Sequence, residues 1–160
     1  LDLIINVLRS FPFIILIVFI IPLTRAIVGT PIGEAAAIVP LTIAAAPFVA
    51  RIIESSLKEV DLGVIEAAKS FGASNTQIIF KVMLKEAVPS IISGLTLTII
   101  NIIGYSAMAG SVGAGGLGKV AISYGYQRYQ TDVMIVTVII LIIMVQGLQS
   151  LGNYLYKKLS

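Results

Sequence analysis

The chain has 160 residues and a net charge of +3; 58% of the residues are hydrophobic and only 12% are charged. Soluble domains carry about 25% charged residues, so this surface needs lipid to cover it, and the few scattered basic residues give no patch for nucleic acid. Cysteine and histidine are absent, which argues against disulfides, thiolate metal sites and histidine-based catalysis, so we expect an integral membrane protein that is neither an enzyme nor a cofactor carrier.

The first apolar run predicts a membrane span over about 11–29. Its charge-free part ends at Thr24, short of the about 20 residues that a bilayer core requires. The helix therefore has to continue past Arg25, with the guanidinium group at the interface. Pro22 is expected to kink this helix, which membrane helices tolerate.

A second span is predicted over about 34–53, where alanine dominates. Pro40 and Pro47 stand seven residues apart and so share one face of the helix. Small side chains let helix backbones approach closely. We expect this span to be buried among other helices rather than to face lipid.

A polar segment follows at about 54–87, within a wider stretch, 51–89, that holds ten of the chain's 19 charged residues: Arg51, Glu54, Lys58, Glu59, Asp61, Glu66, Lys69, Lys81, Lys85 and Glu86. Apolar residues recur at near-helical spacing on both sides of Gly72. Gly72 suits a helix C-cap and Ser74 the N-cap of a following helix. The residues predict a water-exposed helix–turn–helix, which either lies on the membrane surface or docks a soluble partner.

A third span is predicted over about 88–109. Small or polar residues recur every three or four positions along it and so share one side of the helix: Gly94, Thr98, Asn101, Tyr105 and Met108. An asparagine in mid-membrane is costly unless it has a partner or faces a wet cavity. The stripe therefore indicates either a substrate path or close helix packing.

The stretch 110–131 is rich in glycine and tyrosine, and we expect it to be a loop. Within it, Gly113–Gly118 followed by Lys119 resembles a nucleotide-binding loop. That motif requires Ser or Thr next, to hold magnesium, and Val120 stands there instead. We interpret the glycines as permitting a tight turn toward the membrane.

A fourth span is predicted over about 133–156, an uncharged stretch that Lys157 and Lys158 follow. If the chain starts inside, the inner side collects eight Lys or Arg residues and the outer side three; the eight are Arg9, the five of 51–89, Lys157 and Lys158, and the three are Arg25, Lys119 and Arg128. Basic residues favour the cytoplasmic side. We therefore place the central segment and the C-terminus in the cytoplasm.

The central segment resembles the EAA loop of ABC importer permeases, whose pattern is E-A-A, three residues, G, nine residues, I-x-L-P. Here the pattern is Glu66-Ala67-Ala68, Gly72 and Val82-Met83-Leu84, with Lys85 in place of the proline and Pro89 four residues on. Ile21–Arg25 and the run Gly104–Gly118 are similar to the methionine-uptake branch of these permeases. The resemblance covers nearly the whole chain.

The resemblance implies a polytopic all-α permease, with 1–160 forming a single transmembrane domain. The family has five spans and this chain four, so we expect one span to be missing upstream of Leu1. The implied partners are a second permease subunit in a homodimer, two cytoplasmic ATP-binding subunits, an external substrate-binding lipoprotein and the lipid of the bacterial inner membrane. The implied function is ATP-driven import of methionine, or a related small amino acid, by alternating access.

Roles for individual residues follow from the same resemblance. Glu66 is expected to pair with a basic group of the ATPase, Ala67 and Ala68 to allow close approach, and Gly72 to set the turn. For the substrate pathway we rely on side-chain chemistry instead, and we expect it to include Asn101, Tyr105, Ser106 and Met108, because Tyr and Asn can bind the polar ends of an amino acid and Met is adaptable. Two alternatives stay open, a permease for another amino acid and a membrane scaffold that recruits a soluble partner through its hairpin.

Overall fold

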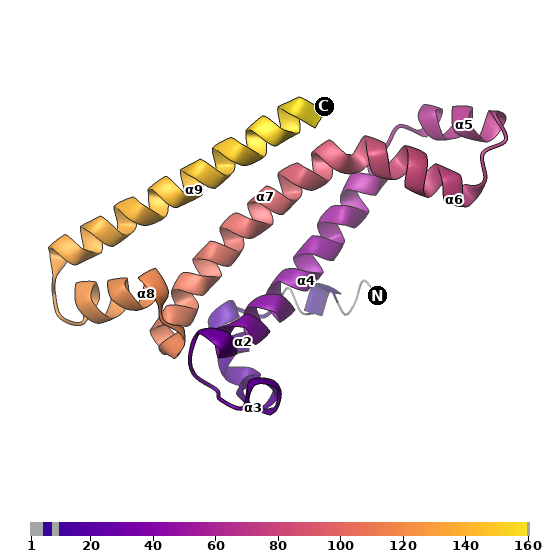
Figure 1. Ribbon diagram of the computed structural model, residues 1–160. Coiled ribbons are helices and arrows are strands. Elements are labelled where there is room, and N and C mark those ends of the chain that lie inside the picture. Colours follow the sequence, from indigo (N-terminus) through magenta and orange to yellow (C-terminus); the bar gives the residue numbers. More distant parts are fainter. Residues whose placement is uncertain (1–4, 8–9, 160) are drawn as a thin grey trace.

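The computed structural model describes residues 5–7 and 10–159, and all regular structure in these ranges is helical (Figure 1). Three helices are long and apolar enough to cross a membrane: α4 (Glu34–Lys58), the continuous helix Asn75–Ala109 and α9 (Thr131–Leu159). The last part of the second, α7 (Leu84–Ala109), lies between α4 and α9 and packs against both. The fold is an all-α membrane bundle, as expected. Arg9, which enters the charge count, lies outside the described residues.

Where the sequence predicts one kinked span over 11–29, the structure has two short helices, α2 (Phe13–Phe19) and α3 (Ile21–Val28). The helix ends at Ile20 because Pro22 has no N–H to donate and its ring crowds the carbonyl one turn back. Both helices pack against α4. Neither is long enough to cross a bilayer, so the described residues contain three candidate spans, one fewer than expected.

The face of α4 that packs inward carries small residues and both prolines, in the order Ala36, Pro40, Ala44 and Pro47, all buried. Ala44 joins Phe13, Leu16, Ile20 and Ala109 in the main apolar core. The opposite face is open in the single chain, and Ile38 on it is exposed. The alanine-rich span is therefore buried along one face instead of all round.

The central segment forms a helical hairpin, which extends from one end of the bundle (Figure 1). Its first arm is α5 (Leu62–Ser70), and its second arm is α6 (Asn75–Gln77) with the π-helical turns of η1 (Ile78–Met83). This second arm continues directly into α7. Lys85, where the permease pattern has proline, lies in the first turn of α7, and Pro89 is the proline inside that helix.

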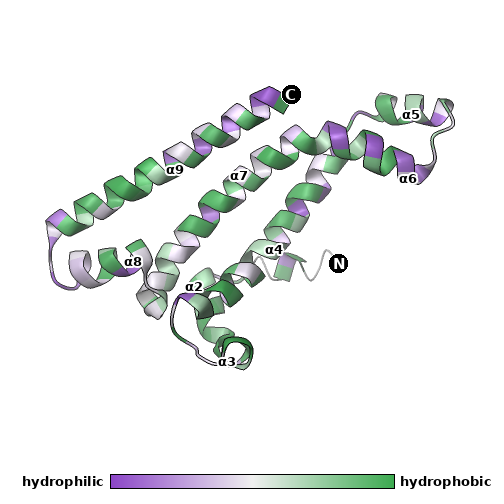
Figure 2. Cartoon of the chain, viewed as in Figure 1, coloured by the Kyte–Doolittle hydropathy of each residue, from purple (hydrophilic) through white to green (hydrophobic). Residues whose placement is uncertain are grey.

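Hydrophilic residues gather at the hairpin and at the C-terminal end of α9, which lie at the same end of the bundle (Figure 2). The long helices between them are mostly hydrophobic along their length. A bilayer can therefore surround the bundle while the hairpin and the C-terminal lysines lie in the same aqueous compartment.

The expectation of a loop over 110–131 is wrong for most of that stretch. The structure has η2 (Gly110–Ala114), α8 (Gly116–Val120) and η3 (Ala121–Tyr126), which fold back beside α7 and α9. Glycine has a low helix propensity, so its abundance here pointed to a loop. The glycines have two structural reasons: Gly113, Gly115 and Gly116 have positive φ at the turn between η2 and α8, as interpreted from the sequence, and a Cβ at Gly118 would overlap the backbone of Ala107 in α7.

Candidate functional site

The tip of the hairpin is a tight turn closed by backbone hydrogen bonds. The N–H of Phe71 donates to the carbonyl of Ala67 at 3.1 Å, and the N–H of Ala73 donates to the carbonyl of Ala68 at 3.1 Å. Gly72 has φ of 78°, a left-handed conformation that glycine adopts without the usual Cβ strain. The end of α5 and its turn are thus fixed by the sequence from Ala67 to Ala73.

The second arm starts with a complete capping box. The N–H of Gln77 donates to Ser74 Oγ at 3.3 Å, and the N–H of Ser74 donates to Gln77 Oε1 at 2.9 Å. The first arm starts at Asp61, whose carboxylate accepts from the N–H of Gly63 at 2.6 Å. Both arms are therefore capped by side chains, as expected for helices exposed to water.

The predicted coupling residues lie together at this tip. Glu66, Ala67 and Gly72 are exposed, and Ala68 is half-buried. The arms meet through the buried Ile78. The exposed side of α5 consequently offers a small, low-profile surface with one carboxylate.

Sequence reasoning missed Phe71, whose ring is 92% exposed at the same tip. It follows Val64 and Ala67 at helical spacing, so the three share one exposed face of α5. An exposed aromatic residue beside a polar turn is typical of an interaction surface. The signal that could have revealed it is the aromatic residue immediately before the C-capping glycine in an otherwise polar segment.

The structure separates the four predicted pathway residues. Asn101 and Met108 are exposed on α7, along one stripe with Ser93, Leu97 and Gly104. Tyr105 points elsewhere: its ring stacks on that of Phe13 with centroids 4.6 Å apart.

Ser106 lies on another side of α7 from Asn101. Its hydroxyl donates to the carbonyl of Ile103 at 2.8 Å, and it lines a cavity that Glu34 and Met144 also line. Around the helix Tyr105 is about 40° from Asn101 and Ser106 about 140°, so of the pathway set only Ser106 lies on a different side of α7.

The predicted stripe of small and polar residues on α7 likewise divides. A Cβ at Gly94 would overlap Ile52 of α4, and Thr98 is buried with its hydroxyl bonded to the carbonyl of Gly94 at 3.0 Å. Gly94 thus packs α7 against α4, and Thr98 is buried one turn further along α7. Asn101 and Met108 are rotated enough around the helix to remain exposed.

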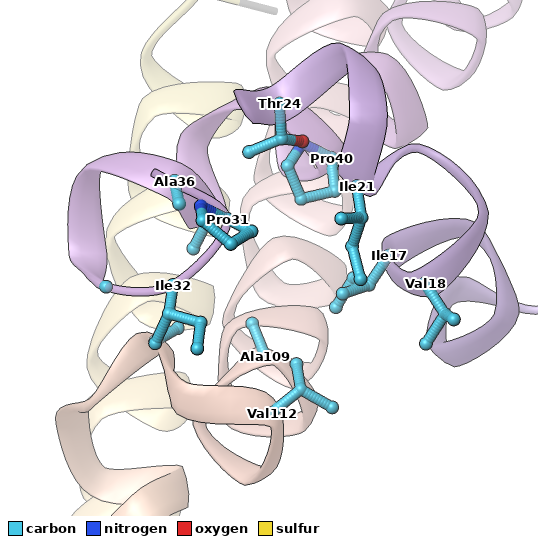
Figure 3. A pocket seen from close by; sticks show the side chains of 13 residues that line it. Ile17, Val18, Ile21, Thr24, Pro31, Ile32, Ala36, Pro40, Ala109 and Val112 are labelled. Atoms are coloured by element: carbon cyan, nitrogen blue, oxygen red, sulfur yellow. The ribbon is translucent and has the colours of Figure 1, made fainter. Parts of the chain in front are cut away.

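A separate apolar cavity of about 310 Å³ lies between α2, α3, α4 and η2 (Figure 3). Its lining is aliphatic apart from Thr24, and it includes Ile17, Ile32, Pro40 and Val112. None of the predicted site residues lines it. Across residues 5–7 and 10–159, no three acidic side chains lie close enough together to hold a metal ion.

Comparison with known proteins gives consistent matches over almost the whole chain. Residues 1–160 match the family of binding-protein-dependent transport system inner membrane components. The chain is 56% identical over 155 residues to a "Probable D-methionine transport system permease protein MetI" of Vibrio cholerae, covering 97% of this chain and 69% of the relative. It is 47% identical over 150 residues to the methionine import system permease protein MetP of Bacillus subtilis, covering 94% and 68%.

Two solved structures also match the chain over almost its whole length. The chain is similar to the MetNI methionine ABC transporter in an inward-facing conformation, with a TM-score of 0.95, 48% identity and coverage of 99% of this chain and 74% of that one. An amino acid ABC transporter with histidines matches with a TM-score of 0.81 at 24% identity, covering 96% and 72%. The second match shows a shared fold.

Proposed function

The chain belongs to the family of binding-protein-dependent transport system inner membrane components, and we propose that it is the membrane-spanning permease subunit of an ABC importer for methionine. Relatives that share about half of its residues carry that function in their names. The protein is a transporter subunit of the bacterial inner membrane and not an enzyme. It works as a homodimer with an ATP-binding subunit and receives substrate from a binding protein.

The observation that carries the mechanism is the continuity of the hairpin with a membrane-crossing helix. Asn75–Ala109 is one helix of 35 residues. At 1.5 Å per residue it is about 52 Å long, well beyond the about 30 Å of a bilayer core. The hairpin therefore extends into the cytoplasm, and a force on its tip acts on the helix that crosses the membrane.

The tip provides the surface for an ATP-binding subunit. Glu66 offers a carboxylate to a basic group, while Ala67 and Ala68 let the partner approach the backbone of α5. Gly72 holds the turn, and Phe71 fills an apolar pocket of the partner. ATP binding and hydrolysis change that partner's shape, and the coupling consists of the different contacts that the hairpin makes in each state.

The exposed stripe on α7 forms the substrate path where two copies of the subunit meet. Asn101 contributes hydrogen bonds for the polar end of an amino acid, and Met108 an adaptable apolar surface for a thioether side chain. Tyr105 belongs to the wall of the path, because its stacking on Phe13 fixes the rotation of α7. Ser106 contributes from the side of α7 that faces Glu34.

Uptake into proteoliposomes tests this function. The full-length subunit is reconstituted with its ATP-binding subunit and binding protein, and uptake of labelled methionine is measured with a panel of competing amino acids. We expect ATP-dependent uptake that unlabelled methionine suppresses most strongly. Stronger competition by another amino acid would contradict the substrate, and ATP-independent uptake or none would favour a scaffold.

A variant tests the path separately. Met108→Glu places a carboxylate on the exposed stripe and should reduce methionine uptake about tenfold or more without loss of the assembled complex. Met108→Leu keeps an apolar side chain of similar size and serves as the control. Normal uptake by the glutamate variant would remove Met108 from the path.

A further inference from the structure

Two hydrogen bonds join α4 to α7 at the base of the hairpin. The hydroxyl of Ser56 donates to Ser90 Oγ at 3.1 Å, and the hydroxyl of Ser90 donates to Glu59 Oε2 at 2.9 Å. Ser56 belongs to α4, Glu59 caps its C-terminus, and Ser90 lies near the start of α7. By contrast, the bonds that Arg51 and Lys58 form with Glu54 join neighbours on a single helix.

This connection, which we call the serine joint (Ser56, Ser90 and Glu59), lies partly inside the protein. Ser56 is 3% exposed and its bond to Ser90 is partly buried, whereas the bond from Ser90 to Glu59 is exposed; Val60 and Ala87, which line the same cavity, are buried. A hydrogen bond shielded from water, such as the one between Ser56 and Ser90, is electrostatically stronger, and a hydroxyl that both accepts and donates couples its two bonds. Ser90 has this double role, so its loss breaks the whole chain of bonds.

The helix next to the serine joint has weak points. Pro89 cannot donate a hydrogen bond to the carbonyl one turn earlier, and η1 just before α7 is π-helical, a geometry that often marks functional sites. Without a cross-link, the second arm could bend here while α4 stayed still. The serine joint fixes α4 to α7 beyond these weak points, on the membrane side of the hairpin.

We propose that Ser90, held between Ser56 and Glu59, is a positioning residue that makes α4 and α7 move as one unit when the hairpin is displaced. The inference rests on the proposed function, because the displacement comes from an ATP-binding subunit. It goes beyond that function because it identifies the residues through which a displacement of the hairpin moves α4 and α7 together. None of the three residues needs to touch substrate or the ATP-binding subunit.

The first experiment measures methionine imported per ATP hydrolysed by the reconstituted complex. Ser90→Ala removes both hydrogen bonds and should lower this ratio about threefold to tenfold, while Ser56→Ala, which removes one, should lower it less. Ser56→Ala combined with Ser90→Ala should match Ser90→Ala alone, because the bonds share one hydroxyl. Ser90→Thr keeps the hydroxyl and should restore most of the ratio.

A serine that lines the same cavity serves as the matched control. The hydroxyl of Ser55 takes no part in the serine joint, so Ser55→Ala should leave the ratio unchanged. If Ser90 had a purely structural role, Ser90→Ala would lower the stability of the complex, and methionine uptake and ATP hydrolysis would fall together. If Ser90→Ala keeps the parental ratio, or loses no more of it than Ser55→Ala does, the proposal is wrong.

A second measurement does not depend on transport. Because the chain contains no cysteine, Ile53→Cys in α4 and Ile99→Cys in α7, on the membrane side of Ser90, can carry spin labels without background. The distance between them should stay the same with and without ATP in the parent and should change with ATP in Ser56→Ala. If the distance changes with ATP in the parent, the serine joint does not hold α4 and α7 together, and the proposal is wrong. Absence of methionine uptake with an invariant parental distance would instead overturn the proposed function.

Discussion

Both segments that connect the long helices, the hairpin between α4 and α7 and the glycine-rich segment between α7 and α9, contain glycines with positive φ, but only the second also uses glycine for close contact between backbones. At Gly72, in the hairpin, an added Cβ would meet nothing within 4 Å. At Gly118, in the other segment, it would overlap the backbone of Ala107. One glycine supplies a left-handed turn on an open surface, and the other supplies room for two helical segments to touch.

The difference indicates what each segment is for. The glycine-rich segment packs inward on α7 and α9 and completes the fold at one end of the bundle. The hairpin packs mainly on itself and leaves Phe71 and Leu62 exposed to solvent. Changes in the first segment should therefore damage stability, and changes in the second should damage association with a partner.

The largest effect is expected at Gly118. Gly118→Ala forces α8 away from α7 and should destabilise the fold by about 3 kcal/mol or more, seen as a lower Tm or lost expression in detergent. Gly147→Ala on α9 is the control, because its Cβ would meet nothing within 4 Å. Equal Tm values for the two variants would contradict the packing role of Gly118.

Phe71→Ala should act on association alone. The ring is 92% exposed in the single chain, so the Tm should hardly change, while affinity for the ATP-binding subunit should fall by about 2 kcal/mol, or about thirtyfold in Kd. Tyr129→Ala is the matched control, since Tyr129 is 88% exposed at the opposite connection. Unchanged affinity for Phe71→Ala would remove the aromatic anchor from the account.

Gly72→Val should cost about 1–2 kcal/mol at the turn, because a branched residue is strained at φ of 78°. The cost falls on the hairpin and not on the bundle. We therefore expect weaker complex assembly and less ATP-driven uptake, with far-UV circular dichroism close to that of the parent. A variant that assembles and transports normally would show that the turn geometry is dispensable.

The smallest effect is expected from the cap of the second arm. Ser74→Ala removes one side-chain bond of the capping box and should destabilise the arm by about 1 kcal/mol, visible as faster amide hydrogen exchange over α6 and η1. Exchange in α9 should not change. Faster exchange throughout the chain would mean that the hairpin is not an independent unit.

The sequence predicted the hairpin well because its signals are local. Gly72 and Ser74 determine the backbone conformation only of the residues beside them. The structure has the left-handed glycine after α5 and the N-cap of α6 at these two positions, as predicted. The exposure of Phe71 could not be predicted in the same way, because an apolar residue at helical spacing has the same pattern whether it faces a core or a partner.

Distant contacts decided the features that were mispredicted. The helical character of 110–131 depends on the closeness of Gly118 to Ala107, which single-residue propensity does not contain. On α7, the predicted stripe was defined by spacings of three and four residues. Residues at these spacings differ by tens of degrees around the helix. Gly94 contacts Ile52 and Tyr105 stacks on Phe13, whereas Asn101 and Met108 are exposed, a division that the sequence left open between a substrate path and helix packing.

If the hairpin transmits the state of the ATP-binding subunit to α7, a distance between the two copies of α7 in the dimer should respond to ATP. Leu97→Cys, on the exposed stripe of α7, places one spin label in each copy of the dimer of an otherwise cysteine-free chain. The account predicts that the distance between the two labels changes when the complex binds ATP and that Gly72→Val abolishes this change. An ATP-dependent change that persists in Gly72→Val, or no change in the parent, would contradict it.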